Sequence, residues 1–311
     1  MTAPFRPKRL LPGATIGVIA PSSGVRDARI EAGMARLREQ GFNLKLGNHL
    51  YDQRGYLAGT DKLRAADFNA MFADPDVDAV LCACGGYGAV RMLDYIDWNV
   101  VAANPKLFIG FSDITTLHLA IEQRVNMVTI HGPMLTAHGR GLSEAAHDCF
   151  WRMIGNAEPY GELPNLGANV RTLVGGRAEG RLVGGCLALL SAAVGAPETP
   201  NFDGKIVIIE DIGERAYRVD RLLMQLLRAG ILSRAAGFVI GTVTDWDSGE
   251  TESPAITLDD VWRDYILPLG KPTVTGFPFG HIPDSLTLPL GCLARMDADA
   301  GTLTLLESAV S

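Results

Sequence analysis

The chain has 311 residues, of which 47% are hydrophobic and 20% charged, and its formal net charge is -7. This composition is typical of an ordinary soluble globular protein. The acidic balance and the lack of a basic run exclude nucleic acid and a membrane surface as the main partners.

The chain lacks the sequence features of a secreted or membrane-spanning protein. Near the N-terminus, Pro12 and Gly13 interrupt the apolar residues, which favours a first strand over a secretory signal. The longest apolar run in mid-chain, residues 182–196, is shorter than the roughly 20 residues that cross a bilayer. Five cysteines, an odd number, do not suggest a disulfide framework, and we expect free thiols in a cytoplasmic protein.

The first half of the chain alternates strand-like and helix-like segments. Apolar runs predict strands at 15–21, 44–50, 77–86, 106–111 and 127–134. Amphipathic or helix-like spacing predicts helices at 26–42, 59–75, 88–96 and 114–121. Alternation of this kind predicts an α/β fold with a parallel sheet covered by helices on both faces.

The second half follows a change in composition. Residues 155–180 are rich in Gly, Pro and Asn, which predicts a linker with a loop. Beyond it we predict strands at 205–211 and 237–245, a helix at 216–230 and a C-terminal hairpin at 292–306. The predicted domains are therefore 1–154 and 181–311, joined by 155–180.

Ser112 stands at the seam between the strand at 107–111 and the helix-like residues 114–121. Many α/β enzymes place a nucleophile on a turn of this kind. A serine that caps the helix N-terminus is the alternative, since such caps are common. The stretch alone does not decide between them.

A serine nucleophile needs a base, and the base needs an orienting group. Of the six histidines, His131 directly follows a strand and His281 lies in a loop dense with Pro and Gly. On spacing alone the two are equal candidates for the base, and either could be a structural histidine bonded to a backbone carbonyl.

Two further stretches could contribute to a site. Glu210 and Asp211 end an apolar strand, where a carboxylate can reach a cleft at the sheet edge or simply cap a helix. Gly85, Gly86 and Gly88 follow another strand, where glycines let backbone N–H groups face an anion or an oxyanion. Neither G-x-x-x-x-G-K-[ST] nor G-x-G-x-x-G is present, so no nucleotide loop is indicated.

Taken together, six stretches resemble the LD-carboxypeptidases, serine peptidases of the murein tetrapeptide and microcin C immunity type. The stretches are GVIAPSS, GGYGAVRMLDYIDW, FIGFSDITTLH, HGPM, EDIGERAYRVDRLLMQL and GHIPDSLTLPLG, in that order along nearly the whole chain. The resemblance implies a flavodoxin-like N-terminal domain and a smaller, β-rich α/β C-terminal domain. An ordinary α/β-hydrolase is disfavoured because G-F-S-D-I lacks the second glycine of G-x-S-x-G.

The resemblance also assigns roles to residues. It implies a triad assembled across the two domains, with Ser112 as nucleophile, His281 as general base and acid, and Glu210 as the orienting carboxylate. It places His131 near the site rather than as the base. The implied oxyanion donors are the N–H groups of Asp113 and Gly86, with Gly85 and Tyr87 nearby.

The implied activity is release of terminal D-Ala from murein tetrapeptides in peptidoglycan recycling, without a metal or cofactor. The partner is a small peptide or muropeptide, and a homodimer is implied. One departure is Cys84, which stands where an arginine is expected before GGYG. The alternatives are a microcin C immunity-type peptidase acting on a peptidyl- or aminoacyl-nucleotide, and a non-catalytic anion-binding protein. Tyr160, the lone aromatic in 155–180, mildly favours the cell-wall substrate over a nucleotide.

Overall fold

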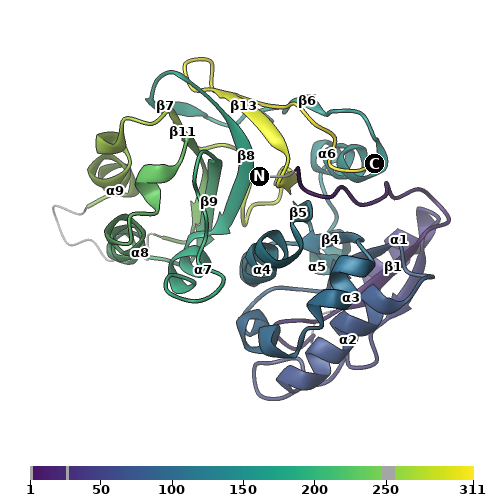
Figure 1. Cartoon of the computed structure of the whole chain (residues 1–311). Helices are drawn as coiled ribbons and strands as arrows, with labels where there is room; N and C mark the ends of the chain where they lie inside the picture. Colours follow the sequence, from purple (N-terminus) through teal and green to yellow (C-terminus); the bar gives the residue numbers. More distant parts are fainter. Residues whose placement is uncertain (1–2, 26–27, 247–255) are drawn as a thin grey trace. The chain divides into compact units, whose positions relative to one another are not determined.

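The computed structural model describes residues 3–25, 28–246 and 256–311. The chain divides into two compact units (Figure 1). Unit 1 contains residues 1–158, 287–291 and 308–311, and unit 2 contains residues 159–286 and 292–307. In the described part of the chain, no helix is both long and apolar enough to cross a membrane.

Unit 1 is built on a sheet with the strand order β12-β5-β4-β3-β1-β2. Its strands are β1 (Thr15–Ile19), β2 (Asn43–Leu46), β3 (Ala79–Cys82), β4 (Leu107–Gly110), β5 (Thr129–His131) and β12 (Leu288–Leu290). Strands β1 to β5 pair in parallel, and their order 2-1-3-4-5 is that of the flavodoxin-like fold. The prediction of a parallel sheet in the first half is confirmed. Strand β12 adds an antiparallel edge from the second half of the chain.

Helices cover both faces of this sheet. They are α1 (Arg29–Glu39), α2 (Asp61–Ala73), α3 (Trp98–Ala103), α4 (Thr115–Val125), α5 (Leu135–Arg140) and α6 (Glu144–Gly155), with the 3₁₀ helices η1 (Ala89–Tyr95) and η2 (Ser112–Ile114). Val80 and Phe108 join one core cluster with Phe68 and Phe72 of α2. Their strand neighbours are also buried and point the opposite way, so neither face is left to solvent.

Unit 2 contains the sheet β6-β14-β13-β8-β9-β10-β11-β7. Its strands are β6 (Gly161–Glu162), β7 (Arg171–Val174), β8 (Arg177–Cys186), β9 (Ile206–Ile212), β10 (Gly237–Thr244), β11 (Thr273–Thr275), β13 (Leu293–Asp297) and β14 (Thr302–Leu305). Its helices are α7 (Leu187–Ala192), α8 (Ala216–Arg228) and α9 (Leu258–Tyr265), with η3 (Leu232–Arg234) and η4 (Leu267–Leu269). Strands β8 to β11 are parallel and the outer pairs antiparallel, so the mixed α/β class is confirmed.

The segment 155–180, predicted as linker and loop, contains β6, β7 and the first residues of β8. Its strands escaped detection because the first half of β8 alternates exposed polar residues with glycine and alanine and has no apolar run. The boundary between the units falls after residue 158, and the end of the chain returns to unit 1. The hairpin at 292–306 is confirmed as β13 and β14.

A buried carboxylate joins β9 to α7 in unit 2. Asp211 is 2% exposed, and its oxygens accept hydrogen bonds from the backbone N–H groups of Ala188 (2.8 Å) and Ile212 (2.8 Å). The thiol of Cys186 lies 3.4 Å from the same carboxylate. Burial raises the pKa of Asp211 from 3.8 to about 6, against the lowering effect of these hydrogen bonds.

This pKa predicts a pH-dependent stability that Asp211→Asn removes. The folded carboxyl holds its proton more tightly than the unfolded one, so its stabilisation is complete below pH 3.8 and is lost as the pH rises through about 6. We expect the unfolding free energy of the wild type to fall by about 3 kcal/mol relative to the variant between pH 3.5 and pH 7.

Urea unfolding at several pH values measures this difference. Asp203→Asn, at an exposed position in unit 2, is the control and should follow the wild type at every pH. A difference between wild type and Asp211→Asn that stays constant with pH would contradict the prediction.

Candidate active site

In unit 1, Ser112 has a backbone conformation that serine seldom adopts. It is the first residue of η2, directly after Phe111, and has a φ of +64°. No side chain caps η2 or the following α4, so the alternative that Ser112 is an N-cap is wrong. Left-handed backbone at a residue other than glycine is strained, and such strain is concentrated at functional sites.

The glycine turn 85–88 lies against this serine. A Cβ atom at Gly85 would stand 3.0 Å from Cβ of Ser112 and 3.1 Å from its Oγ, so a side chain there would crowd the hydroxyl. The turn is tied to Ser23, whose N–H donates to the Gly85 carbonyl (3.3 Å) and whose Oγ accepts from the N–H of Tyr87 (3.2 Å). Gly86, at φ +110°, passes too close to Ser23 to carry a Cβ.

The side chain of Asp113 binds the residue that directly follows the glycine turn. It is 1% exposed, and its Oδ2 accepts hydrogen bonds from Oγ of Ser22 (2.6 Å) and from the N–H of Ala89 (2.8 Å). Burial raises the pKa of this carboxyl above its usual value, although both hydrogen bonds favour the ionised form. Sequence reasoning assigned Asp113 only a backbone role and did not anticipate this contact.

In unit 2, the buried Glu210 and the partly exposed His281 form a hydrogen-bonded pair. Glu210 is fully buried near the end of β9, and its Oε2 lies 2.7 Å from Nδ1 of His281. The carboxylate accepts, so Nδ1 donates and Nε2 is left as the basic nitrogen of the ring. Glu210 and His281 were both predicted as site residues, and the structure brings their side chains together.

Glycine makes the close approach in unit 2 possible. Gly280 has a φ of +117°, and a Cβ there would meet Cβ of Glu210 at 3.0 Å. Its N–H donates to Oγ of Ser285 at 3.0 Å, which fixes the loop that carries His281. The histidine side chain keeps 14% of its surface exposed, so the ring is held by protein and still accessible.

Two histidines of unit 1, His131 and His118, are in packed surroundings. His131 is 1% exposed in β5, and its ring lies 5.6 Å from the ring of Phe111. His118 donates from Nε2 to the Gly110 carbonyl (2.9 Å), and burial lowers its pKa to about 4. Neither is bonded to a carboxylate in the way that His281 is, although His131 lies beside β4, which leads into Ser112.

A cavity of about 390 Å³ opens beside the glycine turn in unit 1. It is lined by Ser23, Gly24, Val25, Arg29, Ile30, Cys84, Gly85 and Thr136. Cys84 is half-buried on its wall, with its thiol 3.5 Å from the Ser23 carbonyl. Among the described residues, no group of three or more His, Cys, Asp or Glu side chains is placed to hold a metal ion.

Sequence reasoning also missed a buried arginine that binds the glycine turn. Arg64 is 2% exposed on α2, and its Nη1 donates to the carbonyls of Gly88 (2.8 Å) and Pro21. A signal was present in the sequence. Arg64 occupies the same helix face as Phe68 and Phe72, at spacings of four and eight residues, where an apolar residue is expected.

Comparisons with known proteins match both units. Models of the LD-carboxypeptidase N-terminal and C-terminal domains match residues 16–132 and 179–296. A Bacillus subtilis protein named "Probable murein peptide carboxypeptidase" is 39% identical, over 99% of this chain and 96% of its own. The murein tetrapeptide carboxypeptidase of Pseudomonas aeruginosa is 32% identical, over 91% of this chain and 93% of its own.

Solved structures agree with these matches. The microcin C7 self-immunity protein in its wild-type apo state superimposes with a TM-score of 0.91 at 25% identity, over 99% of this chain and 100% of that chain. The same protein from Escherichia coli is also a sequence relative at 26% identity. The chain belongs to the LD-carboxypeptidase family.

Proposed function

We propose that this protein is a serine LD-carboxypeptidase that releases the terminal D-Ala of murein tetrapeptides. The observation that carries the proposal is the 2.7 Å bond between Glu210 and Nδ1 of His281, formed by a fully buried carboxylate. A carboxylate in this position fixes the tautomer of the imidazole and stabilises the imidazolium that forms during acyl transfer. A protein that only binds an anion has no need of such a pair.

The proposed reaction follows from the roles of the three side chains. Nε2 of His281 takes the proton of the Ser112 hydroxyl as Oγ attacks the carbonyl before the terminal D-Ala. The N–H groups of Asp113 and Gly86 stabilise the oxyanion. The imidazolium then protonates the amine of D-Ala, which leaves. Water, activated by His281, hydrolyses the acyl-enzyme and restores the serine.

The choice of substrate rests on the relatives. Those at 39% and 32% identity bear murein peptide and murein tetrapeptide names, whereas the microcin relative is 26% identical. One structural feature favours a peptidyl- or aminoacyl-nucleotide as the second candidate. A cavity of about 440 Å³ in unit 2 is lined by the half-buried Trp246, whose indole suits a nucleobase better than Tyr160, the aromatic considered from the sequence.

Release of D-Ala from L-Ala-γ-D-Glu-meso-diaminopimelate-D-Ala tests the proposal directly. We expect release by the wild type and a loss of at least about 10⁴-fold in kcat for Ser112→Ala, because no other group replaces the nucleophile. Glu210→Gln should lose a similar factor, since it removes the charge that orients His281.

Ser233→Ala changes a serine of unit 2 that bonds only to the local Gly230 carbonyl among the contacts described, and it should retain full activity. A folded wild type that releases no D-Ala, but hydrolyses an aminoacyl-nucleotide analogue in a Ser112-dependent way, would replace the murein substrate with the second candidate.

A carboxypeptidase must also recognise the free carboxylate of its substrate. Among the described residues that line the cavity beside Gly85, Arg29 alone carries a positive charge, and the hydroxyl of Thr136 offers a further donor. Because Gly85 touches Ser112, a terminal residue in this cavity would lie next to the nucleophile. We therefore assign the cavity to the D-Ala leaving group, with Arg29 as the partner of its carboxylate.

Comparing the tetrapeptide acid with its C-terminal amide tests this assignment. The wild type should prefer the acid in kcat/KM by about 10²-fold, and Arg29→Ala should remove most of this preference while hydrolysing the amide as the wild type does. Arg36→Ala, on the same helix but outside the cavity, should keep it. A preference for the acid that survives in Arg29→Ala would rule out this role.

A further inference from the structure

We infer that Arg64 is a positioning residue that, together with the Asp113 carboxylate, holds the glycine turn 85–88 in its position beside Ser112. The inference rests on the proposed function, in which Gly86 of this turn supplies an oxyanion donor. It assigns a role in catalysis to an arginine on α2 that lies outside every motif of the resemblance.

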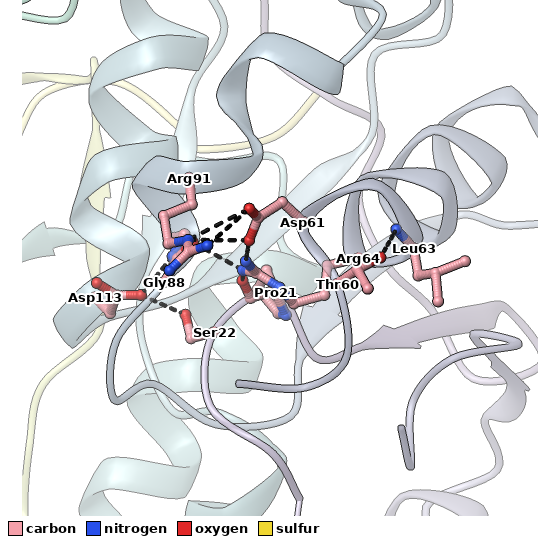
Figure 2. Close-up of polar contacts among 10 residues, drawn as sticks. Pro21, Ser22, Thr60, Asp61, Leu63, Arg64, Gly88, Arg91 and Asp113 are labelled. Atoms are coloured by element: carbon pink, nitrogen blue, oxygen red, sulfur yellow. Dashed lines mark hydrogen bonds and ion pairs between the residues drawn. The ribbon is translucent and has the colours of Figure 1, made fainter. Parts of the chain in front are cut away.

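The guanidinium of Arg64 joins two segments that are far apart in the sequence. Nη1 donates to the carbonyl of Gly88 at 2.8 Å and to the carbonyl of Pro21, just after β1 (Figure 2). Gly88 lies directly on this group, since a Cβ there would stand 3.2 Å from Nη1 and would also strike Leu57. The arginine therefore determines how far the end of the glycine turn stands from the segment after β1.

The carboxylate of Asp113 joins the neighbouring residues of the same two segments. It accepts from Oγ of Ser22 (Figure 2). It also accepts from the N–H of Ala89, so both donors lie one residue further along their segments than the carbonyls that Arg64 binds. Two side chains thus bridge residues 21–22 to residues 88–89. Arg64 does so by donating to one carbonyl of each segment, and Asp113 does so by accepting from one donor of each segment. Next to these bridges, Ser23 binds the preceding residues of the turn, Gly85 and Tyr87.

Arg64 and Asp113 are 2% and 1% exposed, and burial lowers the pKa of the arginine and raises that of the carboxyl. Each charge partly offsets this effect on the other, although the direct ion-pair partner of Arg64 is Asp61. Either charge alone at such burial would be costly. Since Asp113 follows Ser112 directly, its carboxylate couples the strained serine turn to the segments that Arg64 fixes. A displacement of the turn by about 1 Å would be enough to cost about 10²-fold in rate.

The outer side of the cluster provides a matched control. Nη2 of Arg64 binds Asp61, and Asp61 also accepts from Arg91 at 3.1 Å (Figure 2). Arg91 belongs to the same ion cluster, but its side chain is 36% exposed and bonds to Asp61. Its bond to the turn runs from its backbone N–H to the Gly88 carbonyl (3.1 Å), which a side-chain substitution keeps. Loss of Arg91 removes a positive charge from the cluster without removing a bond to residues 85–89.

The experiment uses the full chain with Arg64→Met, Arg64→Lys and Arg91→Met. A fluorophosphonate labels Ser112 as Oγ forms a bond to phosphorus and fluoride leaves, and the phosphoryl oxygen then occupies the proposed oxyanion site. The labelling rate and the ³¹P chemical shift of the adduct report on the oxyanion donors. Hydrogen exchange of the peptide spanning 84–92 reports on the turn itself. D-Ala release gives kcat and KM separately.

For folded Arg64→Met we expect labelling and kcat to fall about 10²-fold with KM within threefold of wild type, a shifted ³¹P resonance, and faster exchange in 84–92. Arg64→Lys keeps the charge and one bond, so it should recover part of each effect, and it replaces Arg64→Met should that variant not fold. Arg91→Met should match the wild type in all of them.

If Arg64→Met has the same labelling rate, ³¹P chemical shift and hydrogen exchange as the wild type, the inference is overturned. A lower melting temperature alone would then show a purely structural role. A wild type that neither labels nor releases D-Ala would instead refute the proposed function. In that case the exchange of 84–92 decides the structural part of the inference alone, and unchanged exchange in the Arg64 variants overturns it.

Discussion

The buried carboxylate of Asp113 is the contact on which the site of unit 1 depends. It sits one residue after Ser112, where it accepts hydrogen bonds from the segment after β1 and from the first residue of η1. At 1% exposure this carboxylate needs both donors, and the positive charge of Arg64 further favours its ionised form. These contacts fix Asp113 and with it the backbone of Ser112 next to it. The strained, left-handed conformation of the serine is therefore held by the hydrogen bonds of a buried carboxylate.

Much of the fold could be predicted because parallel strands are apolar and their helices are periodic. Strands β1 to β5, β9 and β10, and helices such as α8, carry their own burial pattern in the sequence. Strand β12 has three residues and pairs with β5, more than 150 residues earlier, so nothing local identifies it. Strands β6 and β7 are similarly short and lack an apolar run, which is why 155–180 resembled a loop.

The site was only partly predictable from its residues. Spacing left His131 and His281 equal, because a separation of 71 positions between Glu210 and His281 carries no information about their pairing, and the family resemblance chose between them. Ser112 and Asp113 have the composition of a helix cap, and only the backbone of Ser112 distinguishes a strained turn from a cap. Arg64 was overlooked because its helix is recognised by its apolar residues, and the charge among them has meaning only through two carbonyls elsewhere in the chain.

Both units prepare their part of the proposed site in the same physical way. Each places a buried carboxylate at the carboxyl end of a strand with parallel neighbours, Asp113 beyond β4 and Glu210 near the end of β9. Each uses a glycine, Gly85 or Gly280, to bring backbone against the functional side chain more closely than a Cβ would allow. Catalysis by acyl transfer gains most from groups that need no rearrangement as charge develops. Burial makes the alternative positions of these carboxylates costly, so the groups they hold are already oriented before any substrate binds.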